Sequence, residues 1–210
     1  MTEHSVKLTP CKKPDDATHI EQDGTFWKNE KGNWYHWNKH FKKWCGYAGN
    51  ANKDFMNKLL CQDVFDHFLI QEAVITTNVS CHIDGTLQKD FYTLEELEEQ
   101  NLTGLFFVPY GLLRSSCFNL IKGKKTPSYF KFSLLLSPEN LKRTLSQTGS
   151  SFTENDISAV FLNIRFQNGE LTVTTGISYR IFSTDKTLEH EWDTLLKRFL
   201  TKNQISFDEL

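Results

Sequence analysis

The chain has 210 residues, of which 39% are hydrophobic and 24% are charged, and its formal net charge at pH 7 is −2. This composition supports a buried core and excludes an intrinsically disordered chain. Because the net charge is close to zero, the chain is not a polycation, and any nucleic-acid contact would need a local basic patch. The polar N-terminus has no apolar signal segment, and the longest apolar run, at 105–113, is too short to cross a bilayer. We therefore expect a soluble, cytoplasmic protein, in which the five widely spaced cysteines are reduced thiols.

The composition changes near residue 50. The first fifty residues contain most of the tryptophans, namely Trp27, Trp34, Trp37 and Trp44. The sequence predicts an aromatic-rich small β module at 1–47, a linker rich in Gly and Asn at 48–52, and an α+β domain at 53–210. Aromatic residues suit half-buried strands, and turn-forming residues separate them. The module is therefore predicted to have three short strands, at 25–28, 33–37 and 41–47.

Helix and strand signals follow one another through the α+β domain. Thr93 and Ser137 are in N-cap positions of two predicted helices. A helix is also expected where apolar residues recur at helical spacing at 53–60, and a last helix begins at about Lys186. The predicted elements between the first and last helices are a strand at 72–84, a helix at 92–100, strands at 112–121 and 128–136, and a helix at 138–148.

The Asn168-Gly169 pair is the clearest local signal in the domain. Asn-Gly favours a two-residue hairpin turn, which places Phe166 opposite Leu171 and Val160 opposite Ile177. Nearly every pair on that face is apolar, so register and burial agree. Because the element order lacks a repeated βαβ pattern, the predicted fold class is α+β, with a mainly antiparallel sheet and packed helices behind a three-stranded module.

A basic loop is formed by Lys122, Lys124 and Lys125, and Arg114 is nearby in the sequence. A phosphate-binding P-loop is excluded because Phe118 stands where that motif needs Gly and Lys125 where it needs Ser or Thr. Two interpretations remain, a solvated loop and a contact for an anion or a nucleic acid.

Residue types that can bind metal or act in catalysis occur in unsuitable patterns. His36, His40 and Cys45 lack a fourth ligand and paired cysteines. Cys81 and His82 are neighbours on a predicted strand, so their side chains point to opposite faces and cannot pair as nucleophile and base. The sequence therefore predicts no catalytic residue, no metal and no cofactor. The acidic run at 95–99 is interpreted as a solvated helix face.

Aromatic residues and lysines are interleaved in the first segment. The rings form the core of a small sheet or, because strand residues alternate between two faces, some of them are exposed and bind a partner. Exposed rings beside lysine also suit stacking on single-stranded nucleic acid. The candidate partner-binding residues are Trp27, Trp34, Tyr35, Trp37 and Trp44.

Residues from about 52 to 210 resemble a bacterial family known only as a domain of unknown function. The motifs that support the resemblance are KDFMNKLLCQDVFDHFL (53–69), EAVITTN (72–78), HIDG (82–85), KDFY (89–92), LIKGKKTPSYFKF (120–132), LSPEN (136–140), VFLNIR (160–165), LTVTTG (171–176) and STDKTLEHEWD (183–193). The resemblance implies no activity, so it assigns no functional residue.

Residues 14–45 resemble a short aromatic-rich module of phage proteins, through PDDATH (14–19), GTFWK (24–28), GNWYHW (32–37) and Trp44. Members of the larger family begin with a strand just before the helix at 53–60, and here the module occupies that place. This resemblance therefore puts the first strand of the large sheet in doubt, and it implies a recombined gene or a constructed chimera.

Two classes of function follow from these features. The first is a non-enzymatic interaction protein of phage or mobile-element origin, which binds and blocks a bacterial host protein such as a defence effector. The second is a nucleic-acid-binding accessory protein that uses the aromatic and lysine residues together with the basic loop. Strong salt dependence of binding would identify the second class.

Overall fold

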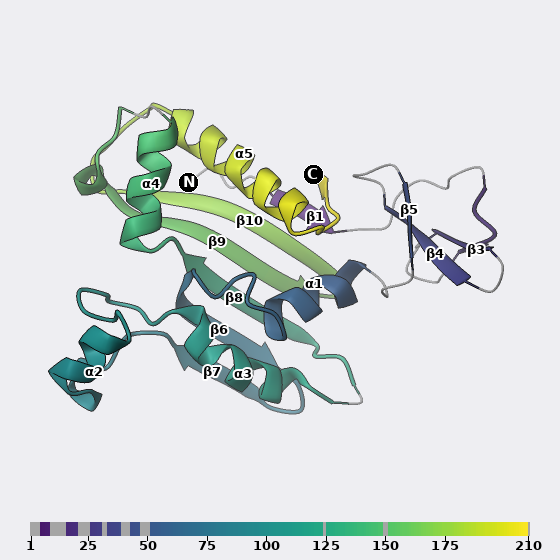
Figure 1. Ribbon diagram of the computed structural model, residues 1–210, viewed down its shortest axis with the longest axis horizontal. Coiled ribbons are helices and arrows are strands. Elements are labelled where there is room, and N and C mark those ends of the chain that lie inside the picture. Colours follow the sequence, from purple (N-terminus) through teal and green to yellow (C-terminus); the bar gives the residue numbers. More distant parts are fainter. Residues whose placement is uncertain are drawn as a thin grey trace.

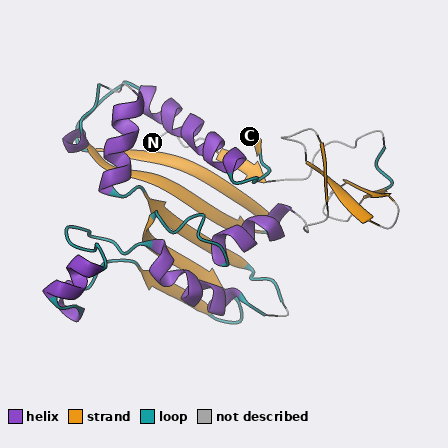
Figure 2. Cartoon of the chain, viewed as in Figure 1, coloured by secondary structure: helices purple, strands orange, loops and turns teal. Residues whose placement is uncertain are grey.

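The structure is a computed structural model that describes residues 5–8, 16–20, 26–30, 33–38, 43–46, 51–123, 125–148 and 151–209. Within these ranges the chain forms a seven-stranded sheet and a four-stranded sheet (Figure 1). Every pairing in both sheets is antiparallel. Helices cover one face of the larger sheet (Figure 2), so the predicted α+β fold class is confirmed.

The seven-stranded sheet has the order β11-β1-β10-β9-β8-β6-β7. Its strands are β1 (Ser5–Leu8), β6 (Leu69–Thr76), β7 (Ser80–Asp84), β8 (Tyr129–Leu135), β9 (Ile157–Gln167), β10 (Glu170–Tyr179) and β11 (Asp208–Glu209). The described helices are α1 (Ala51–Leu60), α2 (Leu94–Glu99), α3 (Tyr110–Ile121), α4 (Pro138–Thr148) and α5 (Thr187–Lys202). Two short 3₁₀ helices, η1 (Lys89–Phe91) and η2 (Glu154–Asp156), complete the described helical elements.

The hairpin of β9 and β10 has the predicted register. Phe166 pairs with Leu171 and Val160 with Ile177. Asn168 and Gly169 have φ angles of 55° and 82°. Both central residues of a type I′ turn need positive φ, which Asn and Gly adopt at low cost.

The predicted Ser137 cap also forms. The amide of Asn140 donates to the Ser137 hydroxyl at 3.3 Å, at the start of α4. At the start of α5 the N-cap residue is Lys186, whose side chain makes no capping hydrogen bond, and the amide of Thr187 donates instead to the carboxylate of Asp185 at 2.9 Å. Leu188, Trp192, Leu196 and Leu200 of that helix are buried, and their spacing places them on one helical face.

The first strand of the large sheet comes from the beginning of the chain. Residues of β1 pair with β10 on one side, Val6 opposite Val173, and with β11 on the other, Val6 opposite Glu209. Near the edge of the sheet the two ends of the described chain therefore lie side by side (Figure 1). The predicted boundary at 1–47 is thus wrong in one respect, because 5–8 belongs to the large sheet. A four-residue strand is too short to be recognised by its hydrophobic pattern.

The four-stranded sheet lies between β1 and α1 in the sequence. Its strands are β2 (His19–Ile20), β3 (Phe26–Glu30), β4 (Asn33–Asn38) and β5 (Lys43–Gly46), in the order β2-β3-β4-β5. The three predicted strands of the module are present as β3, β4 and β5. The additional strand β2 has two residues and pairs His19 with Trp27. This strand could not be predicted, because two residues are too few to show an apolar alternation, and only the pairing with β3 defines it.

The predicted strand at 72–84 is a hairpin. The chain turns at 77–79, and Ala73 pairs with Ile83 and Ile75 with Cys81. Because these paired residues lie on the same face of the sheet, the apolar alternation continues from β6 into β7 and does not mark the turn between them. The predicted alternation is therefore correct, and the predicted single strand is wrong.

The predicted strand at 112–121 is wrong, because 110–121 forms helix α3. Tyr110 and Cys117 are buried, and Leu113, Leu120 and Ile121 are half-buried against the core. These positions follow a helical spacing. Short apolar runs do not distinguish a buried strand from a buried helix, and packing against the sheet decides here.

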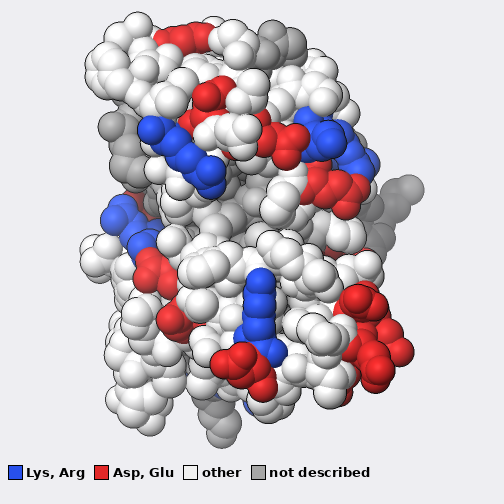
Figure 3. Space-filling model, turned by 90° about the vertical axis from the view of Figure 1, so that its left-hand side faces the viewer, with Lys and Arg blue, Asp and Glu red and all other residues white. Residues whose placement is uncertain are grey.

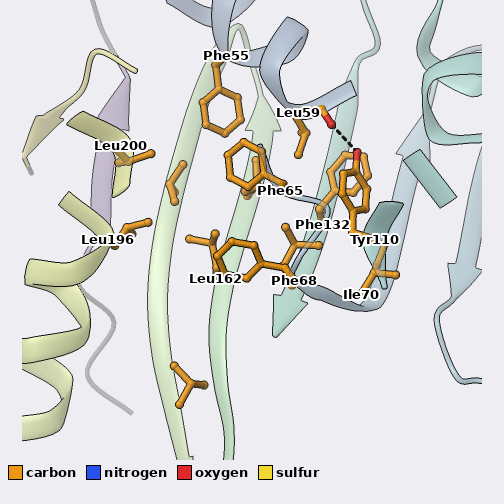
Figure 4. Packing of buried hydrophobic residues seen from close by; sticks show 14 of the residues in the cluster. Phe55, Leu59, Phe65, Phe68, Ile70, Tyr110, Phe132, Leu162, Leu196 and Leu200 are labelled. Atoms are coloured by element: carbon orange, nitrogen blue, oxygen red, sulfur yellow. Dashed lines mark hydrogen bonds between the residues drawn. The ribbon is translucent and has the colours of Figure 1, made fainter. Parts of the chain in front are cut away.

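The core lies between the sheet and helices α1, α3 and α5 (Figure 4). Phe65 packs against Phe55 and Phe199, with ring centroids 5.6 and 5.4 Å away. Tyr110 is fully buried, and its hydroxyl donates to the backbone carbonyl of Leu59 at 2.9 Å. This hydrogen bond satisfies the polar group and ties α3 to α1. Among the described residues, no helix has the length and apolar character needed to cross a membrane.

Candidate functional site

The predicted partner-binding residues all lie on the four-stranded sheet. Trp27 is on β3, Trp34, Tyr35 and Trp37 are on β4, and Trp44 is on β5. In the register of this sheet Trp37 pairs with Trp44 and Tyr35 with Lys28. The backbone pairing therefore brings residues from three strands together. The side chains of these five aromatic residues lie outside what the structure describes.

The basic loop borders a groove on the large domain. The groove has a volume of about 930 Å³ and lies between the start of α1, the end of α3, the loop before β8 and the turn of the β9–β10 hairpin. Asn52 of α1 donates through Nδ2 to the carbonyl of Gly169 at 3.1 Å and so connects two of these walls. Elements that are distant in the sequence therefore form one concave surface.

The floor of the groove is apolar. Phe130 and Phe166 come from adjacent strands and stack with 5.1 Å between ring centroids and an interplanar angle of 12°. Further apolar lining residues are Met56, Leu60 and Ile121. Because these side chains also belong to the main core or pack against it, the floor is held by the fold.

Lysines provide the charge of the groove. Lys53, Lys122 and Lys125 line it, and the described lining residues include neither Asp nor Glu. The Lys122 ammonium lies 5.9 Å from the centroid of the Phe118 ring, which is a cation–π distance. The predicted contacts Lys122 and Lys125 are therefore together in one site, whereas Lys124 lies outside the described residues. Such a groove can accept a group with an anionic part and an apolar part.

Arg114 does not belong to this groove. It projects from α3 and forms an ion pair with Asp66, with 2.9 Å between Nε and Oδ1. Its predicted role as an anion contact depended on closeness in the sequence, but Arg114 lies two helical turns before Lys122. The ion pair with Asp66 explains why Arg114 is directed away from the basic loop.

Cys81 and His82 lie on opposite faces of β7, as their adjacency predicts. Cys81 is half-buried, whereas His82 is exposed. His82 Nε2 lies 3.4 Å from Oε2 of Glu72, whose pKa is lowered mainly by the hydrogen bond from Lys131. Cys117 is fully buried, and burial raises the pKa of its thiol to about 11. The environment of Cys117 therefore disfavours its thiolate form.

The surface around α2, predicted to be a solvated acidic face, also exposes large apolar side chains. Phe91, Leu94 and Phe106 are exposed by 82%, 79% and 67%. All three lie in the segment between β7 and α3, with Leu94 on α2 itself, Phe91 in η1 just before it and Phe106 in the loop after it. The signal in the sequence that could have indicated this surface is the presence of large apolar residues close to the acidic run at 95–99.

These features define an α+β protein in which helices cover one face of an antiparallel sheet. Residues 58–208 match a family of unknown function, DUF5721, and the chain belongs to that family. The match begins inside α1 and ends in β11, so it excludes β1 and the whole four-stranded sheet. No curated protein and no solved structure matches the chain.

Proposed function

We propose that this chain is a non-enzymatic interaction protein whose four-stranded aromatic sheet binds a protein partner. The main support is the position of that sheet. It occupies part of 9–50, between β1 and α1, and the described residues of this segment contribute no strand to the seven-stranded sheet. The segment is also outside the region that matches the family. Because this segment does not contribute to the large sheet, its residues can serve a separate role in binding.

The composition of the inserted sheet favours protein binding. Strands β3, β4 and β5 contain Trp27, Trp34, Tyr35, Trp37 and Trp44. Trp and Tyr are the residues most enriched among those that dominate binding energy at protein interfaces. The proposal in its more specific form is that the partner is a bacterial host protein, such as a defence effector, which the bound chain blocks. That form depends on the resemblance of 14–45 to a phage module.

The first prediction concerns two tryptophans of β4. We expect the double variant Trp34→Ala and Trp37→Ala to bind the partner at least about 30-fold more weakly, since hot-spot residues contribute about 2 kcal/mol or more. The partner is first captured with the full chain, then purified, and the affinities of both proteins are measured by calorimetry.

The matched control is Phe182→Ala, which removes a ring that is 95% exposed and lies outside the module. We expect this control to bind as the wild type does. Unchanged affinity of the double variant, with the circular dichroism of a folded protein, would refute the role of the aromatic sheet.

A second candidate function is nucleic-acid binding, which the lysine groove favours. Lys53, Lys122 and Lys125 line a concave surface whose described lining lacks acidic side chains. Phosphate groups are attracted to such a surface, and binding releases condensed counterions.

This candidate leads to a second prediction. Anisotropy of labelled single-stranded DNA and RNA should show binding that weakens steeply with salt, and the double variant Lys122→Ala and Lys125→Ala should lower the slope of log K against log[salt] by about 1.4. The control Lys142→Ala removes an exposed lysine on α4 and should leave the slope unchanged. Absence of binding at low salt would exclude this candidate.

A further inference from the structure

Residues 85–109, between β7 and α3, form a small lobe with a core of its own. Leu87, Leu97 and Leu102 are buried together, and Tyr92 and Leu105 pack against them. In Figure 1 the helix of this lobe, α2, lies at the lower left, away from the other helices. We call this segment the acidic lobe.

The short helix α2 is held at both ends. At its start Thr93 and Glu96 form a reciprocal capping box, in which the Thr93 amide donates to the Glu96 carboxylate at 2.8 Å. At its end the amide of Leu102 donates to the carbonyl of Leu97 at 2.8 Å, and Asn101 has a φ angle of 54°. These are the features of a Schellman motif. A helix of six residues is therefore ordered by its caps and by the small core.

The acidic lobe is also attached to the sheet. The amide of Gly85 donates to the carbonyl of Gln71 of β6, and the amide of Ile70 of β6 donates to the carbonyl of Val108, each at 2.9 Å. Within the lobe, the amide of Leu87 donates to the carbonyl of Phe106 at 2.9 Å, and Thr86 and Phe107 form a β-bridge. The Asp84 carboxylate accepts hydrogen bonds from the amide and the hydroxyl of Thr86, at 2.9 and 2.7 Å. The surface of the lobe is thus preorganised, which lowers the entropy cost of binding.

Three large apolar side chains of the lobe are exposed, namely Phe91, Leu94 and Phe106. The Phe91 ring lies edge to face against Tyr92, with centroids 5.2 Å apart, and Phe106 lies in the same way against Phe107 at 4.9 Å. Tyr92 in turn packs against the small core. These contacts hold the exposed rings on ordered neighbours. Large apolar side chains that stay exposed on an ordered segment are typical of interaction sites.

The charge of the lobe is strongly negative. Between residues 85 and 109 the acidic side chains are Asp90, Glu95, Glu96, Glu98 and Glu99, and Lys89 is the only basic one. Glu96 is used in the capping box, whereas Glu95, Glu98 and Glu99 are exposed on α2. Figure 3, which faces the side of the molecule where α2 lies, shows acidic side chains gathered at one edge.

We propose that the acidic lobe is the docking site for a basic amphipathic helix of a partner protein. The apolar side of that helix would cover Phe91, Leu94 and Phe106, and its Lys or Arg residues would lie beside the glutamates of α2. Charge complementarity selects this occupant, because an acidic surface repels nucleic acid and anionic lipid. The proposal goes beyond the proposed function, since it uses another surface and holds whether or not the aromatic sheet binds a partner.

The test uses the full chain and a fluorescein-labelled amphipathic helical peptide built from Leu and Lys. Two further peptides serve as comparisons: one with Glu in place of each Lys, and one of the same Leu and Lys composition scrambled so that it has no apolar face. Fluorescence anisotropy should show saturable binding of the first peptide, weakened by added salt, and at least about tenfold weaker binding of the other two.

Variants of the chain locate the binding surface. The triple variant Phe91→Ser, Leu94→Ser and Phe106→Ser should weaken binding of the Leu–Lys peptide at least about tenfold, since exposed apolar anchors carry most of the binding energy. The triple variant Glu95→Gln, Glu98→Gln and Glu99→Gln should weaken binding and reduce its salt dependence. The control Phe182→Ser, at a side chain 95% exposed outside the lobe, should bind as the wild type does.

Several outcomes would overturn the proposal. They are absence of saturable binding, equal binding of the Leu–Glu or scrambled peptide, and full retention of binding by the serine variant. A further outcome of this kind would come from light scattering of the chain without peptide. If the chain is a dimer and the serine substitutions make it a monomer, a second copy of the chain occupies the lobe. Because the substituted side chains are exposed, unfolding temperatures should stay within about 2 °C of the wild type.

Discussion

Replacing Gly85 by alanine should destabilise the protein by about 3 kcal/mol or more. A Cβ atom at this position would lie 1.9 Å from the carbonyl oxygen of Ile70 and 2.8 Å from its carbonyl carbon. Both atoms belong to the backbone of β6, so neither can move aside as the end of a flexible side chain would. Gly85 also donates to the carbonyl of Gln71 and accepts from the amide of Val108, each at 2.9 Å. Relief of the clash would therefore disturb the junction of β6 with the acidic lobe.

Thermal and urea unfolding of the Gly85→Ala variant measure this effect. For a chain of this size we expect the unfolding temperature to fall by roughly 6 to 12 °C or more, or expression without a folded protein. The matched control is Gly123→Ala, since the nearest atom to a Cβ at that position, the Lys125 carbonyl oxygen, is 4.0 Å away. A Gly85→Ala protein as stable as this control would contradict the packing at the junction.

Truncation of Phe132 to alanine should cost about 3 to 5 kcal/mol of unfolding free energy. Phe132 is fully buried on β8, in the middle of the large sheet. Its ring contacts Tyr110 of α3 edge to face at 5.9 Å and lies 5.7 Å from Phe130. The substitution would leave a cavity where the sheet meets α3, and the surrounding strands can close it only in part.

The unfolding free energy of this variant is measured by urea unfolding and compared with that of two other variants, with the same dependence on urea concentration assumed for all three. Phe132→Leu keeps much of the volume and should cost less than about 1.5 kcal/mol. Phe182→Ala removes an equal ring from a site that is 95% exposed and should change stability by less than about 0.5 kcal/mol. Equal stability of the Phe132→Ala and Phe182→Ala proteins would show that the sheet and α3 do not pack as described.

Local signals explain which elements could be predicted. The Asn168-Gly169 turn, the Ser137 cap of α4 and the Thr93 cap of α2 each depend on residues within a few positions of one another. Their physical causes are positive φ at Asn and Gly and hydrogen bonds to free amides at helix starts. Neither requires knowledge of the rest of the chain, and all three predictions are confirmed.

The wrong predictions share a dependence on distant partners. An apolar run at 110–121 suits either a strand or a helix, and contacts of α3 with α1 and β8 decide between them. The four residues of β1 form a strand because β10 and β11 accept them on both sides. Similarly, Arg114 pairs with Asp66, which lies in a different part of the sequence.

The candidate sites could be predicted only in part. Lysines of the basic loop were recognised from the sequence, but the apolar groove beside them is built by α1, α3, β8 and the β9–β10 turn together. The acidic run on α2 was recognised as well. The exposure of Phe91 and Phe106 was not, since Phe is among the residue types most often buried.

By itself, the sequence determined the α+β class, the aromatic segment, most helix starts and the register of one hairpin. These properties follow from turn conformation, capping hydrogen bonds and apolar periodicity, which act over a few residues. Only the tertiary structure decided that β1 joins the far side of the large sheet, that α3 is a helix, and that three apolar side chains stay exposed on the acidic lobe. The reason is that burial and strand pairing are shared between segments far apart in the chain, so no single segment contains the information that settles them.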